Sequence, residues 1–355
     1  MRWAVVAALG VGLACEGMPD VSEEGRHVRL AMDDGLVPCG GTVEHMDRFI
    51  ELLSAEFDVP PPTGDQRLMY YWLEREGFGV RTVCPDGVIG CSFVASAWVK
   101  SIPVNHELVH AVAWPIGSPR PFFIEGLATA YAGLGDSSQL WRNRRWGPVE
   151  HSLMVGLPRE VDYSTAGGFV GYVIEEHGIA AFLRFYAKLP LLATRGQVER
   201  KFADEFGVSL ASSIAAFERD RPCEQTVATQ MLVECAASAI AWDGVRFTEY
   251  RELACEQEDV VGPYDGSSAV VFRTLEVMEE GEYEVTMIGE NITGRSAGAS
   301  LYMVSCGACA ERESLVVKAG EGAVRLKLAS GVYSLRLVGQ AREVTSVGWL
   351  IERVP

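Results

Sequence analysis

Three residues in the first half of the chain carry side chains that bind divalent metal ions. His106 and His110 are four positions apart, and Glu125 follows with fourteen residues between it and His110. In a helix, positions four apart lie on one face, so both imidazoles would point to the same place. Hydrolytic zinc sites use three protein ligands and keep one position for water. The spacing therefore predicts a Zn²⁺ site, with one ion per chain, held by His106, His110 and Glu125.

Glu107 follows the first histidine directly and completes the pattern HExxH as HELVH. It lies about 100° further round a helix than His106, so it can reach the same cavity without binding the ion. We expect it to act as the general base that activates water. HExxH also occurs by chance, in which case the histidines would only pack. However, Leu108, Val109 and Val112 predict a buried helix, in which two histidines and a glutamate without a partner would be costly.

Two helices must position these side chains. We expect the histidine helix to end near Pro115 and a second helix to begin at Pro121, where the missing N–H of proline costs nothing. On that second helix Glu125, Ala128 and Ala132 share one face. Small residues beside the ligand would let the two helices approach closely.

HELVH followed by Glu125-Gly-Leu-Ala128 resembles the gluzincin metallopeptidases, the clan that includes thermolysin and the zinc aminopeptidases. The short stretch between the two motifs is similar to the compact, peptidase MA-like bacterial branch. The resemblance implies a zincin fold, a bound zinc ion and hydrolysis of peptide bonds in peptide or protein substrates. Thermolysin has an aspartate four residues after the glutamate, where this chain has Thr129, so the thermolysin subtype is disfavoured.

The resemblance extends to a tyrosine further along the chain. Residues 163–178 are similar to the segment that carries the catalytic tyrosine of the family, where a tyrosine precedes a helix that ends at a glycine fifteen residues later. This implies that the Tyr163 hydroxyl donates a hydrogen bond to the developing oxyanion. The alternative is that Tyr163 only packs at the start of the helix. Tyr172 is a weaker candidate for the same role.

No motif for binding a free amino terminus precedes HExxH. The aminopeptidases of the family carry Gly-x-Met-Glu-Asn there, and this chain does not, which disfavours an aminopeptidase and leaves an endopeptidase open. Residues 91–100 have the composition of a strand, and in the family an edge strand at this place pairs with extended substrate. The competing hypothesis is a non-catalytic, surface-anchored binding lipoprotein with a degenerate zincin fold. The intact Glu107 argues against it, because a structural metal site does not need that carboxylate.

Residues 1–15 have the features of a bacterial secretory signal. One arginine and an apolar run precede Gly-Leu-Ala-Cys15, which resembles a lipoprotein cleavage site. The run is shorter than the roughly 20 residues that a membrane-spanning helix needs. The sequence therefore predicts an exported protein that is either attached to the membrane through lipidated Cys15 or secreted.

The cysteines support export. Nine are present, and eight remain if Cys15 is lipidated, an even number that indicates disulfides. Three of the eight precede the histidine helix and five follow the predicted catalytic helices, so complete internal pairing needs at least one bridge between the two parts. We expect the pairs Cys84–Cys91, Cys235–Cys255 and Cys306–Cys309, with Cys39–Cys223 as the crossing bridge.

The chain as a whole is predicted to be an α+β protein of two domains. Its formal net charge of −17 disfavours nucleic acid and anionic membrane surfaces as partners. Residues 24–222 are expected to form the zincin-like catalytic domain, a small N-terminal α/β layer plus a helical bundle. In residues 223–355 short alternating segments are separated by turns, which predicts a C-terminal β-sandwich as an accessory domain.

The boundaries of single elements follow from periodicity and end signals. Thr42 is expected to cap the first helix of the α/β layer. Further helices are predicted over residues 121–133, 165–177, 179–189, 195–206 and 209–220, and strands over 26–33, 68–73, 91–100, 269–275, 282–288, 300–305, 314–318, 322–328, 331–338 and 345–353.

Overall fold

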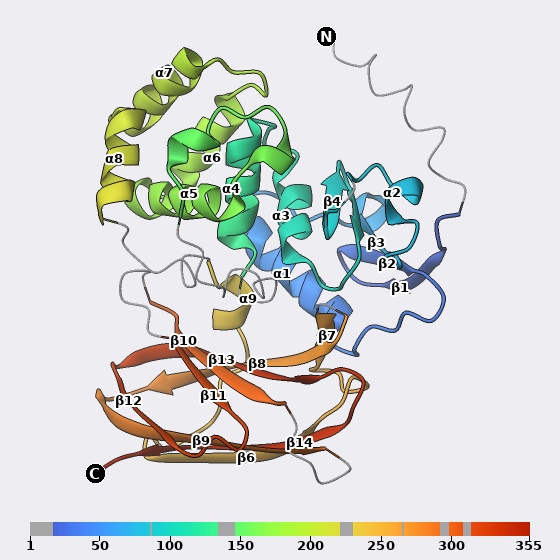
Figure 1. Ribbon diagram of the computed structural model, residues 1–355, viewed down its shortest axis with the longest axis vertical. Coiled ribbons are helices and arrows are strands. Elements are labelled where there is room, and N and C mark those ends of the chain that lie inside the picture. Colours follow the sequence, from blue (N-terminus) through green and yellow to red (C-terminus); the bar gives the residue numbers. More distant parts are fainter. Residues whose placement is uncertain are drawn as a thin grey trace.

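The structure is a computed structural model, which describes residues 17–85, 87–133, 146–220, 230–264, 266–291, 298–307 and 314–355. It confirms the α+β class. A mixed sheet with helices builds the N-terminal half, and two antiparallel sheets build the C-terminal half (Figure 1). The predicted signal at 1–15, with Cys15, and the predicted junction between residues 222 and 223 lie outside the described residues.

A five-stranded sheet forms the first layer of the N-terminal half. Its strands lie in the order β1 (Val21–Glu24), β2 (Val28–Met32), β3 (Leu68–Trp72), β5 (Ser96–Val99) and β4 (Gly90–Phe93). The three central strands are parallel, and the edge strands β1 and β4 are antiparallel to their neighbours. The short helix α2 (Phe78–Arg81) lies in the connection between β3 and β4.

The prediction of one continuous strand over residues 91–100 is wrong, because the chain reverses within it. β4 and β5 form a hairpin in which Cys91 pairs with Trp98, and Val94 and Ala95 make the turn. Val94 has a φ of +58°, a conformation that β-branched residues rarely adopt. Two-residue hairpin turns usually carry glycine or asparagine at such a position, so no turn signal marks this reversal in the sequence.

Helix α1 (Thr42–Glu56) packs against β2 and against the histidine helix. Its apolar face is made by Met46, Phe49, Ile50 and Leu53, all buried. The predicted capping role of Thr42 is wrong. Gly41 is the N-cap, and the Thr42 hydroxyl donates a 2.7 Å hydrogen bond to the carbonyl of Gly262 in the C-terminal half. The Thr42 hydroxyl therefore binds a distant carbonyl instead of accepting from a backbone N–H in the first turn of its own helix.

The remaining large helices stand beside the sheet as a helical layer (Figure 1). They are α3 (Asn105–Ala113), α4 (Pro121–Tyr131), α5 (Tyr163–His177), α6 (Ile179–Lys188), α7 (Arg195–Phe206) and α8 (Leu210–Asp220). The bounds of α4 to α8 lie within two residues of the predicted ones. Their facing sides meet in one aromatic core that includes Phe123, Phe169 and Phe202.

The C-terminal half is a sandwich of two antiparallel sheets. The strands are β6 (Arg246–Leu253), β7 (Val261–Tyr264), β8 (Ser268–Val277), β9 (Gly281–Asn291), β10 (Ser300–Ser305), β11 (Ser314–Lys318), β12 (Val324–Leu328), β13 (Gly331–Gln340) and β14 (Thr345–Arg353). One sheet has the order β11-β10-β13-β8-β7 and the other β12-β9-β14-β6. Leu335 of β13 and Trp349 of β14 lie in the core that the sheets share. The strand prediction missed β6 and β7; charged residues dominate β6, and β7 contains a proline.

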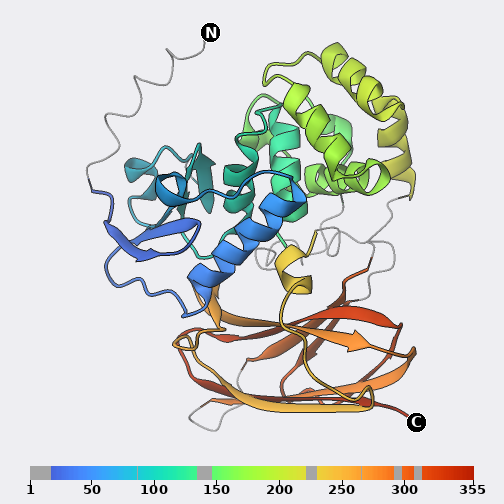
Figure 2. The ribbon, with the colours of Figure 1, turned by 180° about the vertical axis from the view of Figure 1, so that it is seen from behind.

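The two halves make close backbone contacts where α1 begins. The Gly41 N–H donates to the carbonyl of Val260 at 2.8 Å, and the Gly40 N–H donates to that of Cys255 at 2.7 Å. A Cβ added at Gly41 would lie 2.6 Å from the carbonyl oxygen of Glu258, so only glycine allows this approach. From this junction α1 runs up to the helical layer (Figure 2), with the short helix α9 (Leu232–Cys235) packed beside it.

The described disulfides confirm one predicted pair and correct the others. Cys84 is bonded to Cys91, as predicted. The predicted pair Cys235–Cys255 is wrong, because Cys255 is bonded to Cys39. This bridge does join the two parts of the chain, as the cysteine count requires, but Cys255 stands in place of the predicted Cys223.

Cys235 is bonded to Cys306, so the predicted pair Cys306–Cys309 is also wrong. Pairing neighbours in sequence failed because the fold of the sandwich and α9 decides which Cβ atoms come within bonding reach. Cys223 and Cys309 lie outside the described residues. The three disulfides are typical of an oxidising, extracellular compartment. Across the described ranges, no helix has the length and apolar character needed to cross a membrane.

Candidate metal centre

Two neighbouring helices carry the three predicted metal ligands. His106 and His110 lie one turn apart on α3, whose opposite side is buried through Leu108 and Val112. Glu125 lies in the middle of α4, where it is buried. The apolar residues of α3 therefore fix the helix against the core and turn both imidazoles toward α4.

The start of α4 is anchored to the loops around it. Pro121 is the first helical residue, as predicted. The guanidinium of Arg120, just before it, donates hydrogen bonds to the carbonyls of Val155 and Ala193, each at 2.9 Å. This anchoring fixes the position at which Glu125 faces α3, one turn further on.

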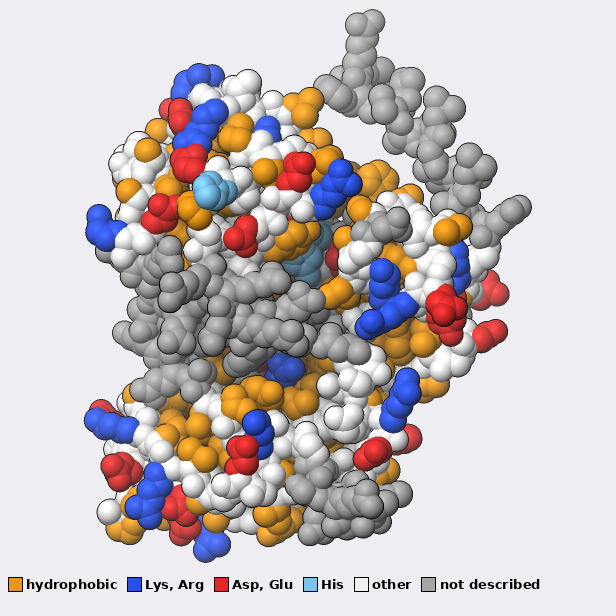
Figure 3. All heavy atoms as spheres, viewed as in Figure 1, with side chains coloured by type: hydrophobic (Ala, Val, Ile, Leu, Met, Phe, Trp, Pro, Cys, Tyr) orange, Lys and Arg blue, Asp and Glu red, His pale blue; other side chains and the backbone are white. Residues whose placement is uncertain are grey.

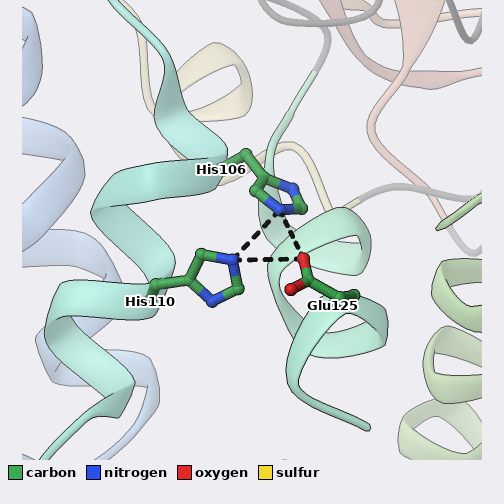
Figure 4. Close-up of side chains that lie close together, drawn as sticks. All are labelled: His106, His110 and Glu125. Atoms are coloured by element: carbon green, nitrogen blue, oxygen red, sulfur yellow. Dashed lines mark hydrogen bonds and ion pairs between the residues drawn. The ribbon is translucent and has the colours of Figure 1, made fainter. Parts of the chain in front are cut away.

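The three ligand side chains converge on one point (Figure 4). Nε2 of His106 lies 3.0 Å from Oε2 of Glu125, and Nε2 of His110 lies 3.3 Å from the same oxygen. The two Nε2 atoms are 3.1 Å apart, and their rings are nearly perpendicular. The structure thus brings together the residues predicted from sequence, and the group can hold a metal ion.

The separations fit a tetrahedral ion. Bonds of about 2.0–2.1 Å to zinc place ligand atoms about 3.3–3.4 Å apart. The three observed separations, between 3.0 and 3.3 Å, are close to one face of that tetrahedron. Imidazole nitrogen and carboxylate oxygen are both common zinc ligands, so spacing and donor type agree.

The electrostatics keep Glu125 in its metal-binding form. Burial alone would raise the pKa of its carboxyl group. The charges and hydrogen bonds of His110 and His106 outweigh that effect and hold the pKa well below its usual range. The carboxylate is therefore ionised at neutral pH, as metal binding requires.

Glu107 is buried beside the three residues, and its ionised form is less stable than that of a carboxyl group in water. Burial raises the pKa of its carboxyl group, opposed by the charges of His110 and His106. Its Oε2 is buried and has no hydrogen-bond partner among the described residues. A buried carboxylate oxygen without a partner is costly, and a functional role in proton transfer is a physical reason to retain it.

Strand β4 supplies two contacts to Glu107 that the sequence did not reveal. Ser92 lies close enough to favour the ionised carboxylate, which opposes the rise in the pKa of Glu107. A Cβ added at Gly90 would lie 3.2 Å from Cγ of Glu107, so glycine allows the strand to lie close to this side chain. The disulfide partner Cys91 lies between these two residues and ties β4 to the preceding loop. None of the three belongs to a metal-binding motif, so only the fold reveals their role.

Tyr163 lies next to the ligands, at the start of α5. Its ring centroid is 5.6 Å from that of His106, and Glu125 is near enough to raise the pKa of its hydroxyl. Burial and the negative charges of Glu125 and Glu107 raise its pKa above the usual value, so the hydroxyl keeps its proton. The ring of Tyr172, the weaker candidate, packs against Phe217 of α8.

Tyr186 is a second tyrosine whose pKa is raised in part by the negative charge of Glu125. It lies on α6 and is buried. Burial and the charge of Glu125 raise the pKa of its hydroxyl. No motif in the sequence marks it, because α6 reaches Glu125 only through the packing of the helical layer.

Glycines bring α4 and α5 into close contact beside the site. A Cβ added at Gly126 would lie 2.6 Å from Cγ2 of Val170 and 2.8 Å from the carbonyl oxygen of Ala166. A Cβ at Gly167 would lie 2.5 Å from Cγ2 of Thr129. The close approach predicted from Ala128 and Ala132 concerned the histidine helix and α4; these two glycines permit a different close contact, between α4 and α5.

Gly126→Ala is expected to lower the free energy of unfolding by about 1–3 kcal/mol, because α4 and α5 must move apart to admit the methyl group. Denaturant unfolding of the metal-free protein measures the change. Gly196→Ala on α7 is the control, since its added Cβ would have Arg200 no closer than 3.6 Å; it should be neutral or slightly stabilising. Equal stabilities of the two variants would show that the contact between α4 and α5 is not tight.

The ligands are reached from one face of the molecule. Figure 3 shows histidine atoms at the floor of a hollow between the helical layer and the N-terminal sheet, with hydrophobic side chains at its border. His106 and His110 are only half-buried, and Tyr163 is 36% exposed. The site is therefore open to a ligand from solvent.

The sequence matches no protein-family model and no curated protein. Among solved structures, it is similar to the pre-peptidase C-terminal domain of collagenase from Bacillus anthracis, with 12% identity and a TM-score of 0.24, over 33% of this chain and 94% of that one. A periplasmic inhibitor of g-type lysozyme from Aeromonas hydrophila matches with 12% identity and a TM-score of 0.21, over 33% and 94%. A carbohydrate-binding module of lichenase 5A from Cellvibrio mixtus matches with 13% identity and a TM-score of 0.19, over 30% and 88%. At these TM-scores the likenesses carry no argument about function.

Proposed function

We propose that the chain is a zinc-dependent peptidase of the gluzincin type, in the compact peptidase MA-like branch, with a zincin-like N-terminal domain. The observation that carries the proposal is the convergence of two imidazoles and one carboxylate within 3.3 Å of one another. Beside them lies the buried carboxylate of Glu107. Ligands alone would support a structural metal site; the additional carboxylate supports hydrolysis.

His106, His110 and Glu125 are the residues that would hold Zn²⁺. When bound, zinc supplies a Lewis acid for the scissile carbonyl and lowers the pKa of water. Glu107 accepts the proton of the attacking water and then passes it to the leaving amine. Its raised pKa suits this exchange, because a general base works best when its pKa approaches the operating pH.

Tyr163 is proposed to stabilise the oxyanion that develops on the scissile carbonyl. Its ring lies beside that of His106, and its raised pKa keeps the hydroxyl a hydrogen-bond donor. With substrate bound, this hydroxyl would donate to the developing oxyanion. Tyr163 thus has the position and the protonation state that the role needs.

Tyr163→Phe is expected to lower kcat on the order of 10²-fold with a much smaller change in KM, because the hydrogen bond strengthens in the transition state. Steady-state kinetics on one peptide measures both constants. Tyr172→Phe is the matched control, because it removes a tyrosine hydroxyl from another position of the same helix, α5. If kcat is unchanged in Tyr163→Phe, the hydroxyl does not stabilise the oxyanion and Tyr163 has only a structural role.

Peptides or unfolded proteins are the proposed substrates. Within the described residues β4 pairs only with β5, so its other edge is free to pair with an extended chain. β4 also lies against Glu107 at Gly90, so a chain paired with this strand would lie near the proposed general base. We propose an endopeptidase, since no segment for binding a free amino terminus was found in the sequence.

The disulfides support action outside the cytoplasm. We propose export through the segment at 1–15, with attachment to the cell envelope through lipidated Cys15. The sandwich is proposed as an accessory domain of the peptidase.

Cleavage of an unfolded protein, with and without a chelator, tests the proposed function. We expect cleavage that the chelator abolishes and added zinc restores. The competing proposal is a binding lipoprotein that uses the same fold without catalysis. Bound zinc with no cleavage of a broad peptide library would favour that proposal over ours.

A further inference from the structure

Two exposed aromatic rings lie together close to the proposed active site. Phe93 is the last residue of β4 and is 55% exposed, and Trp114 follows the last residue of α3 and is 43% exposed. Their ring centroids are 5.8 Å apart, at an interplanar angle of 54°. Large apolar side chains that cluster at a surface usually mark a binding site.

The position of Trp114 is set by the helix that carries the ligands. Its N–H donates to the carbonyl of His110 at 2.9 Å, so the helical turn continues through Trp114. Residues four apart share one face, and Trp114 therefore follows His110 one turn, about 6 Å, further along. The ring lies beyond the ligands on the same side of α3.

The position of Phe93 is set by the strand that contacts the general base. Phe93 ends β4, the strand whose first residue, Gly90, lies so close to Glu107 that an added Cβ would be 3.2 Å from Cγ of that side chain. β4 and α3 are in contact along this stretch, from Gly90 beside Glu107 to Phe93 beside Trp114. The aromatic pair therefore lies at one end of the seam that has the general base at its other end.

We propose that Phe93 and Trp114 form an aromatic shelf that binds a bulky apolar side chain of a peptide lying along β4. The proposal rests on the proposed peptidase function and adds its substrate class: peptides with leucine, phenylalanine or a similar residue near the scissile bond. A peptide paired with the free edge of β4 has side chains that alternate between its two faces. One of them meets the shelf, and burial of its apolar surface supplies binding free energy.

Two peptide series, identical except for leucine, phenylalanine, alanine or aspartate at one position, test the shelf with the full zinc-loaded chain. At the position that contacts the shelf, we expect kcat/KM to be about 10- to 100-fold higher for the apolar residues than for alanine. Phe93→Ala, Trp114→Ala and the double variant should bring this ratio close to one, with a smaller loss for the alanine peptide. Tyr250→Ala is the control, because Tyr250 is an aromatic residue 71% exposed on β6 of the sandwich.

The shelf proposal would be overturned if the variants lose kcat/KM equally for all peptides. It would also be overturned if the double variant keeps the wild-type ratio of kcat/KM between the apolar and the alanine peptides. A second readout separates this failure from that of the proposed function. Calorimetric Kd values for the leucine and alanine peptides, measured on Glu107→Gln, should show the same preference and the same loss in Phe93→Ala. If the wild type cleaves no peptide but this preference in binding remains, the shelf stands and the peptidase proposal falls. If the wild type cleaves with no apolar preference at any position, the peptidase stands and the shelf falls.

Discussion

Replacing Glu107 by glutamine is expected to lower kcat by about 10²–10⁴-fold while zinc stays bound. The amide keeps the size of the side chain but cannot take the proton from the attacking water. The group that can hold the ion is made by His106, His110 and Glu125, so the substitution does not change a proposed ligand. Steady-state kinetics and zinc content per chain, measured on the same preparation, check both parts.

The chemically matched control is Glu176→Gln, the same substitution at an exposed position of α5. It should leave kcat unchanged. Full activity in Glu107→Gln would contradict the assigned role, and loss of zinc in that variant would mean that Glu107 belongs to the metal site itself.

Replacing Glu125 by glutamine is expected to weaken zinc binding by more than about 100-fold, because removal of an outer hydrogen-bond partner alone costs 10- to 100-fold. The substitution keeps the shape of the side chain but removes the charge that attracts the ion. Competition with a chromophoric chelator measures the affinity. Activity should fall with zinc content and return only in part at high zinc concentration.

His110→Ala should give the same loss of affinity, and Glu176→Gln should not. Zinc affinity equal to that of the wild type in either ligand variant would place the ion elsewhere. The stability should follow the affinity, since a ligand that binds only the folded state raises the free energy of unfolding. Chelator should therefore lower the Tm of the wild type and have little effect on Glu125→Gln.

The grouping of His106, His110 and Glu125 was predictable because the information is local. Two histidines four apart on a helix must share a face, and the proline at 121 marks the start of the next helix. Tyr163 lies beside His106 because it begins α5, where a helix start was predicted close by. In each case the position of the side chain is set by the single helix that carries it.

The surroundings of the site were not predictable in this way, because they depend on contacts between distant segments. Ser92 reaches Glu107 only once the hairpin of β4 and β5 lies beside α3. The turn at Val94 and Ala95 contains no glycine or asparagine, so the sequence gives no sign that the chain reverses there. The glycines at 126 and 167 are ordinary small residues in sequence, and only the contact between α4 and α5 gives them a role.

The same distinction holds for the fold as a whole. The longer helices and most strands were located by periodicity, but the short helices α2 and α9 were not predicted. The hydroxyl of Thr42 and the partners of Cys39 and Cys235 were assigned wrongly. Each of these interactions joins residues far apart in the chain. Local rules cannot identify partners at such separations in the chain: Thr42 and Cys39 have theirs in the C-terminal half, and Cys235 of α9 is bonded to Cys306, 71 residues away.

X-ray absorption at the zinc edge, combined with metal content, tests the central claim most directly. One zinc per chain is expected, with a first shell of two imidazole nitrogens and carboxylate and water oxygens at about 2.0–2.2 Å, and with one oxygen contribution lost in Glu125→Gln. A chain that binds no zinc, a shell that contains sulfur, or a spectrum unchanged by Glu125→Gln would contradict the account.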